Sequence, residues 1–281
     1  MPADPIPPGV RARLAGLRLS TRRAVGAQGI GLHASRSRGA GLEFAQYRPY
    51  EPGDEPRQID WKLYARSDRY FIREAERESP VALWVLIDAT ASMAARWTTA
   101  RALAACLGEL ALAGGDRFGW VVIADDGLEL AVPAAGVGQR DRLRRELAPA
   151  RGSGRFPAAA RLAPVWEKVG PRDLVVVLSD LFDPDMVGVA TRLADAGRDV
   201  AAIQLLTVAE RDFDFAGGHR FRDPETGEEL PGDADALRAD YLARFNAARA
   251  ALAAELAAHG VRMASHTADE PLDAPLRALF A

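Results

Sequence analysis

Cysteine, lysine and histidine are all scarce in this sequence, and each shortage excludes a class of site. Cys106 is the only cysteine among 281 residues, so an intrachain disulfide is excluded and a reducing compartment is the natural setting. It stands in an Ala/Leu-rich segment, where a small buried residue is expected rather than a nucleophile. The four histidines do not stand at zinc-ligand spacing with Cys106, so no structural zinc site is expected.

Lysine is restricted to Lys62 and Lys168. A phosphate-binding P-loop needs a lysine beside its glycines, and the GSG at 152–154 lacks one. The sequence therefore argues against a nucleoside-triphosphate site of that kind.

Long apolar runs are also missing. None approaches the roughly 20 residues that span a bilayer, and the N-terminal MPADPIPPGVR lacks the apolar core of a secretory signal. Hydrophobic residues make up 48% and charged residues 27% of the chain, a balance that allows a full core. We therefore expect a soluble, cytoplasmic protein.

The net charge of −3 is small, but it is unevenly distributed. Residues 1–42 form a segment rich in arginine, proline and glycine, in which Asp4 is the only acid among the first forty residues. This segment is either a basic arm that contacts nucleic acid or acidic lipid, or a solvated, partly disordered tail, and we favour the tail. Its arginines stand at positions 11, 13, 18, 22, 23, 36 and 38.

Residues 43–79 are dense in aromatic residues with charges between them. PGD at 52–54 is typical of a turn, and RYFIREAE alternates like a half-exposed strand. The aromatic residues could stack on bases, or they could form a small β-rich subdomain. We favour the subdomain and regard nucleic-acid binding as unlikely, because acids nearly match bases here. The aromatic residues are Phe44, Tyr47, Tyr50, Trp61, Tyr64, Tyr70 and Phe71.

From residue 80 to 281, apolar strands alternate with helical segments. The unbroken apolar run at 81–87 predicts a strand buried on both faces. The alternation predicts a doubly wound α/β domain with a mostly parallel six-stranded sheet, interrupted by an inserted hairpin near 210–232. The six expected strands cover 81–87, 115–125, 128–134, 172–180, 199–206 and 261–266, the third of them antiparallel to the second.

Oxygen-bearing side chains follow the two most apolar strands. Asp88, Thr90 and Ser92 lie on the loop after the first strand, and Asp180 ends the strand at 172–180. Ligands of open α/β sheets bind at the carboxyl ends of the strands. Hard oxygen ligands suit Mg²⁺ or Mn²⁺. Neutral hydroxyl ligands leave the ion electrophilic, so that it can accept a carboxylate from a partner.

Two other interpretations of these residues remain open. Serine and threonine after a strand often cap a helix, and Asp180 could simply form a turn. Alternatively, Asp88 could accept a phosphoryl group, as in phosphatases that place an aspartate after a buried strand. Such enzymes need a second acid two residues on, where Thr90 stands, so we do not expect catalysis.

The segment DATAS at 88–92 resembles the metal-ion-dependent adhesion motif, D-x-[ST]-x-S, of von Willebrand factor A domains. GDEPRQIDW, GDRFG, SDLFDP and DPETGE resemble segments of the bacterial domain-of-unknown-function family 58, and this resemblance runs from about residue 26 to the end. It implies a von Willebrand factor A-like fold. It also implies a non-enzymatic adaptor that cooperates with a MoxR-type AAA+ ATPase in maturing or remodelling an unknown client protein.

The adhesion motif implies Mg²⁺ or Mn²⁺ held by Asp88, Thr90, Ser92 and Asp180. It also uses a threonine from an intervening loop. In the matching stretch, residues 151–163, that position falls on Gly154, and the adjacent Ser153 is the candidate substitute.

Overall fold

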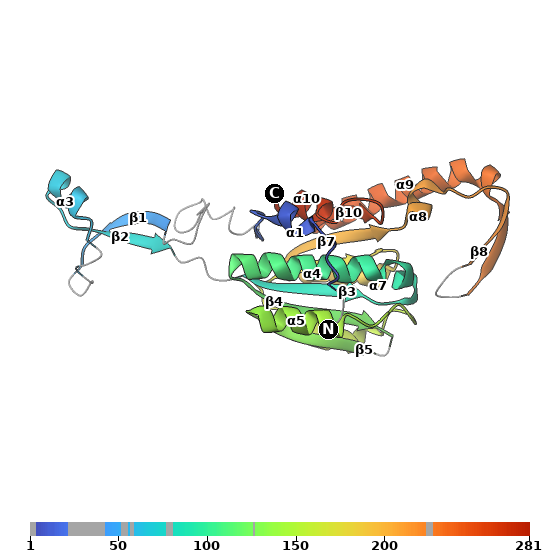
Figure 1. Ribbon diagram of the computed structural model, residues 1–281, viewed down its shortest axis with the longest axis horizontal. Helices are drawn as coiled ribbons and strands as arrows, with labels where there is room; N and C mark the ends of the chain where they lie inside the picture. The colour runs from blue at the N-terminus through green and yellow to red at the C-terminus, as the bar shows by residue number, and fades with distance from the viewer. Residues whose placement is uncertain are drawn as a thin grey trace. The chain divides into compact units, whose positions relative to one another are not determined.

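The computed structural model (Figure 1) describes residues 4–21, 43–51, 56, 59–76, 81–125, 127–222 and 227–281. The chain divides into two compact units, one made of residues 1–19 with 80–281 and the other of residues 20–79. Within the described ranges, no helix is both long enough and apolar enough to cross a lipid bilayer.

The larger unit contains a six-stranded sheet in the order β10-β7-β6-β3-β4-β5. All neighbouring strands are parallel except β5, which is antiparallel to β4. This architecture confirms the predicted fold class. The strands are β3 (Ala82–Asp88), β4 (Arg117–Ala124), β5 (Gly127–Ala134), β6 (Leu174–Ser179), β7 (Asp199–Leu206) and β10 (Arg262–Thr267).

Helices cover both faces of this sheet, which explains why the central strand β3 is apolar from Ala82 to Ile87. Leu83, Val85 and Ile87 face one core, and Trp84 and Leu86 face the other. The first core includes residues of α4 (Trp97–Gly114), α5 (Val137–Glu146) and α10 (Ala274–Phe280). The second includes residues of α6 (Ala163–Lys168), α7 (Pro184–Asp195) and α9 (Ala234–Ala258).

Residues 4–19 do not form the solvated tail that the sequence predicted. Ile6, Val10, Leu14 and Leu19 are buried in the first core, and the short helix α1 (Val10–Leu14) carries two of them. Val10 and Leu14 are four residues apart, which places both on the same face of α1. The tail interpretation is therefore wrong for residues 4–19, and residues 22–42 lie outside the described part of the chain.

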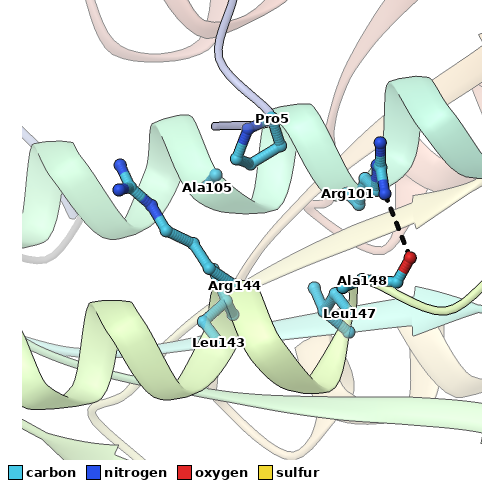
Figure 2. A pocket seen from close by; sticks show the side chains of 7 residues that line it. All are labelled: Pro5, Arg101, Ala105, Leu143, Arg144, Leu147 and Ala148. Carbon is cyan, nitrogen blue, oxygen red and sulfur yellow. Dashed lines mark hydrogen bonds between the residues drawn. The ribbon is translucent and has the colours of Figure 1, made fainter. Parts of the chain in front are cut away.

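Ion pairs also attach this segment to the domain. The Nε atom of Arg13 lies 2.5 Å from Oδ1 of Asp273, and Arg11 contacts Glu109 at 3.2 Å. Pro5 borders a small pocket between α4 and α5, as Figure 2 shows. Two of the arginines expected in a nucleic-acid-binding arm are thus paired with acids of the same domain.

The smaller unit contains a two-stranded antiparallel ribbon of β1 (Glu43–Pro49) and β2 (Phe71–Glu76). The helix α3 (Trp61–Ser67) lies between them in sequence, and the Asp60 side chain caps it by accepting from the backbone N–H groups of two residues in its first turn. The rings of Tyr64 and Tyr70 stack with centroids 4.5 Å apart. Ring packing within the unit thus accounts for part of the aromatic content of residues 43–79.

The predicted hairpin insertion is confirmed. The short helix α8 (Val208–Asp212) precedes β8 (Gly218–Arg222) and β9 (Glu229–Asp233), which pair antiparallel, and α9 follows. Figure 1 shows α9 extending beyond the sheet beside the hairpin. Only Ala234 and Leu256 of this long helix are buried, so most of its surface is open.

Cys106 is fully buried in α4, and burial raises the pKa of its thiol to about 12. At pH 8 only about one thiol in ten thousand would then be ionised, and the thiolate is the reactive form. We expect the folded protein to resist a thiol reagent at pH 8 and to take up one equivalent after denaturation. Fast labelling of the folded protein would contradict this burial.

Candidate functional site

Asp88 is the last residue of β3, not a loop residue as the sequence predicted, because it still pairs with Ile123 of β4. Its side chain is 1% exposed. Oδ1 accepts hydrogen bonds from the backbone N–H of Thr90 at 2.9 Å and from its hydroxyl at 2.7 Å. Oδ2 accepts from the hydroxyl of Ser179 at 2.7 Å, which links the ends of β3 and β6.

The hydroxyls of Thr90 and Ser92 lie next to this carboxylate. Thr90 precedes the 3-10 helix η2 (Ala91–Arg96), but its side chain makes no capping hydrogen bond, and Ser92 lies inside η2. Their Oγ atoms are 3.3 Å apart. Neighbouring ligands in an octahedral Mg²⁺ shell are separated by about 3 Å, so this pair is spaced for one ion. The capping interpretation therefore fails for both residues.

Asp180 directly follows β6 and is 1% exposed. Its Oδ1 accepts from the backbone N–H of Phe182 at 3.1 Å, so the turn interpretation holds for that oxygen. Its Oδ2 is buried without a hydrogen bond to any described residue. Burial raises the pKa of Asp180, and the nearby Arg96 opposes this rise. Leu181, which follows, has a φ of 58°, a backbone conformation that is costly for leucine and common at binding sites.

Arg96 brings a cation into the same cluster. Its side chain is only 6% exposed, and one guanidinium nitrogen, Nη1, lies 3.4 Å from Oδ2 of Asp180. The same nitrogen donates to the Ser92 carbonyl, and Nη2 pairs with Glu210. Glu210 also completes the capping box of α8 with Thr207. The guanidinium therefore connects the oxygen-rich loop to the start of the inserted segment.

The loop at 152–154 reaches the site through its backbone. The N–H of Ser153 donates to the Ala89 carbonyl at 3.2 Å, and the Gly154 carbonyl accepts from Ala91 at 2.9 Å. Gly154 has a φ of 70°, and an added Cβ would lie 2.3 Å from Cβ of Asp125, so a threonine does not fit there. Ser153 is exposed, and its hydroxyl makes no hydrogen bond to the other described residues of the site.

A protein-family model, described as a protein of unknown function, DUF58, matches residues 46–251. The chain belongs to the DUF58 family. Two similar proteins are uncharacterized proteins of Mycobacterium tuberculosis (strain H37Rv) and Mycobacterium bovis. Each is 27% identical over 273 residues, which cover 93% of this DUF58 chain and 86% of the relative.

Three solved structures are similar to this DUF58 protein. The conserved hypothetical protein BatB from Bacteroides thetaiotaomicron is 15% identical, with a TM-score of 0.35, over 64% of this chain and 98% of its own. An aerotolerance-related membrane protein from Bacteroides fragilis is 15% identical, with a TM-score of 0.40, over 71% of this chain and 98% of its own. The VWA domain of SpRpn10 is 13% identical, with a TM-score of 0.38, over 70% of this chain and 94% of its own. The sheet order and the helices on both faces make the larger unit von Willebrand factor A-like.

The site residues of this DUF58 protein gather several oxygen atoms at the carboxyl edge of the sheet, but the described residues include no group of three or more His, Cys, Asp or Glu side chains placed to hold a metal ion. Asp88, Asp180 and Glu210 bring three carboxylates, against the single guanidinium of Arg96 that pairs with two of them. Asp180 Oδ2 and the two hydroxyls are oxygen donors, which Mg²⁺ and Mn²⁺ prefer. Oδ2 of Asp180 is buried without a hydrogen bond to a described residue, and its ion-pair partner is the guanidinium of Arg96 at 3.4 Å.

Three residues of this network were not identified from the sequence. Ser179 directly precedes Asp180, and its position at a strand end was a usable signal. Glu210 stands three residues after Thr207, which is the spacing of a capping box, but that pattern does not reveal its pairing with Arg96. Arg96 sits in an alanine-rich segment that gives no sign of its burial.

Proposed function

We propose that this DUF58 protein is a cytoplasmic, non-enzymatic interaction protein that binds Mg²⁺ or Mn²⁺ through Thr90, Ser92 and Asp180, with Asp88 behind them. The observation that carries this proposal is the buried Oδ2 of Asp180, which lacks a hydrogen bond to a described residue, beside two closely spaced hydroxyls at the carboxyl edge of the sheet. An ion held largely by neutral hydroxyls keeps its positive charge. It can therefore take a carboxylate from a partner protein as a further ligand.

The hydrogen bonds of Asp88 favour binding over catalysis. A phosphoryl-accepting aspartate must present an oxygen to its substrate, whereas both oxygens of Asp88 already accept hydrogen bonds and the side chain is buried. Thr90 stands where such an enzyme would carry its second acid, and its hydroxyl donates to Asp88. The proposed role of Asp88 is to orient Thr90 and supply negative charge.

We propose a MoxR-type AAA+ ATPase as the partner, acting with this protein on a client of unknown identity. The resemblance of residues 26–281 to family members that accompany such ATPases supports this choice. An acidic side chain on the ATPase or on the client would complete the ion shell.

The test is binding of the protein to the MoxR-type ATPase of the same organism, measured by biolayer interferometry in Mg²⁺ and in EDTA. We expect binding in Mg²⁺ and a loss of roughly tenfold or more in EDTA or with Ser92→Ala. The control is Thr98→Ala, which removes an exposed hydroxyl in the first turn of α4. Equal binding in Mg²⁺ and EDTA would exclude recognition through the ion, and no binding in either would exclude this partner.

A further inference from the structure

Arg96 is held unequally by its three oxygen partners. The guanidinium makes hydrogen bonds to the Ser92 carbonyl and to Glu210, and the same Glu210 carboxylate accepts from the backbone N–H of Thr207. Its contact with Asp180, at 3.4 Å, is long and lacks a hydrogen bond. The firm attachments of Arg96 are thus to the loop backbone and to α8, and its hold on Asp180 is the weak one.

Asp180 and Arg96, the two residues of this weak contact, each have a polar atom without a hydrogen bond to a described residue. Oδ2 of Asp180 and Nε of Arg96 are buried, and neither makes a hydrogen bond to a described residue. An arginine and a carboxylate at their best form two short parallel hydrogen bonds, which this pair does not. A second cation can therefore replace the guanidinium at Asp180 with little loss of bonding.

We propose that Arg96 is a tethered cation that competes with the divalent ion for Asp180, and that Glu210 retains the guanidinium when the ion binds. This inference rests on the proposed ion site. Two cations cannot both approach one buried oxygen without strong repulsion, because charges in a low-dielectric interior are weakly screened. Arg96 thus neutralises Asp180 when no ion is bound, and it sets how much ion is needed to fill the site.

The contact with Phe182 supports a guanidinium that moves off Asp180 but remains attached to Glu210. The Phe182 ring lies 5.6 Å from the Arg96 guanidinium carbon, and Glu210 remains on the other side. Because Glu210 belongs to the capping box of α8, ion binding is linked through Arg96 to the segment that leads into the β8–β9 hairpin.

Calorimetric titration of Mn²⁺ into chelator-treated protein tests this competition. We expect Arg96→Gln to bind Mn²⁺ roughly tenfold or more tightly than the wild type, because the competing cation is gone. The matched control is Arg101→Gln, which removes the same charge from α4 at a residue that donates to the Ala148 carbonyl instead. The control should stay within about twofold of the wild type. Equal or weaker binding by Arg96→Gln would overturn the proposal.

A second pair of variants keeps the test decisive if Arg96→Gln does not fold. Glu210→Gln removes the residue that retains Arg96, so Mn²⁺ affinity should fall by about fivefold or more, while Asp212→Asn, on the same short helix, should change it by less than about twofold. Unchanged affinity in Glu210→Gln would overturn the tethered cation. If Mn²⁺ affinity is the same in the Arg96 and Glu210 variants as in the wild type, the ion site remains supported and the competition by Arg96 is overturned. If no folded variant binds Mn²⁺, both the ion site and the competition are overturned.

Discussion

Replacing Asp88 by asparagine is expected to weaken Mg²⁺ or Mn²⁺ binding by roughly a hundredfold while leaving the fold intact. The amide has nearly the same shape as the carboxylate, and its oxygen can still accept from Thr90. The hydroxyl of Ser179 can rotate to accept from the amide nitrogen, so the link between β3 and β6 survives. What is lost is the negative charge behind the ion.

Alanine at the same position should behave differently. Asp88 ends a buried strand and accepts three hydrogen bonds, so Asp88→Ala leaves the donors of Thr90 and Ser179 without a partner. We expect a loss of about 2–5 kcal/mol in the free energy of unfolding for alanine and a change of less than about 1 kcal/mol for asparagine. A loop residue would have tolerated either change.

The two variants separate an ion-binding role from a structural one. Calorimetric titration measures ion affinity, and urea denaturation followed by circular dichroism measures stability. If Asp88→Asn binds the ion as tightly as the wild type, Asp88 does not contribute to the ion site. If Asp88→Asn is as unstable as Asp88→Ala, the negative charge of the carboxylate itself stabilises the fold.

The sheet could be predicted from the sequence because a buried parallel strand needs an apolar run without interruption. The apolar runs that precede Asp88 and Ser179 meet this condition, and β3 and β6 pair side by side. Parallel strands that are neighbours end at the same edge, so the polar residues after them come together. That is why the sequence predicts that Asp88, Thr90, Ser92 and Asp180 lie close together.

The N-terminal segment and Arg96 could not be placed in the same way. The helix α1 has only five residues, too few for a clear periodic signal, and its ion-pair partners Glu109 and Asp273 are far away in sequence. The burial of Arg96 depends on Asp180, which follows β6, and on Glu210, which lies in α8. A pattern within one segment carries no information about such distant partners.

Gly152→Ala is expected to destabilise the protein by about 2–4 kcal/mol and to weaken the ion site with it. Gly152 has a φ of 115°, where an L-residue is strained. An added Cβ would lie 2.4 Å from Cα and 2.5 Å from the backbone nitrogen of Ala94 in η2. Backbone atoms cannot rotate away as a side chain can, so either the loop or η2 must move.

That movement would reach the ion ligands through two backbone hydrogen bonds. Ser153 donates to the Ala89 carbonyl and Ala91 donates to the Gly154 carbonyl, and both bonds join the loop to the segment that carries Thr90 and Ser92. Shifting the loop therefore displaces the hydroxyls from each other. The loop at 152–154 therefore contributes by positioning Thr90 and Ser92, even though the Ser153 hydroxyl makes no hydrogen bond to the described residues of the site.

The matched control for this change is Gly138→Ala in α5, where an added Cβ meets no atom within 4 Å. Alanine is the better helix former, so the control should be neutral or more stable by up to about 1 kcal/mol. Urea denaturation and Mn²⁺ titration of both variants measure the two effects. Wild-type stability in Gly152→Ala would mean that the loop does not pack against η2 in solution. Lowered stability with unchanged Mn²⁺ affinity would mean that the loop supports the fold but does not position the ion ligands.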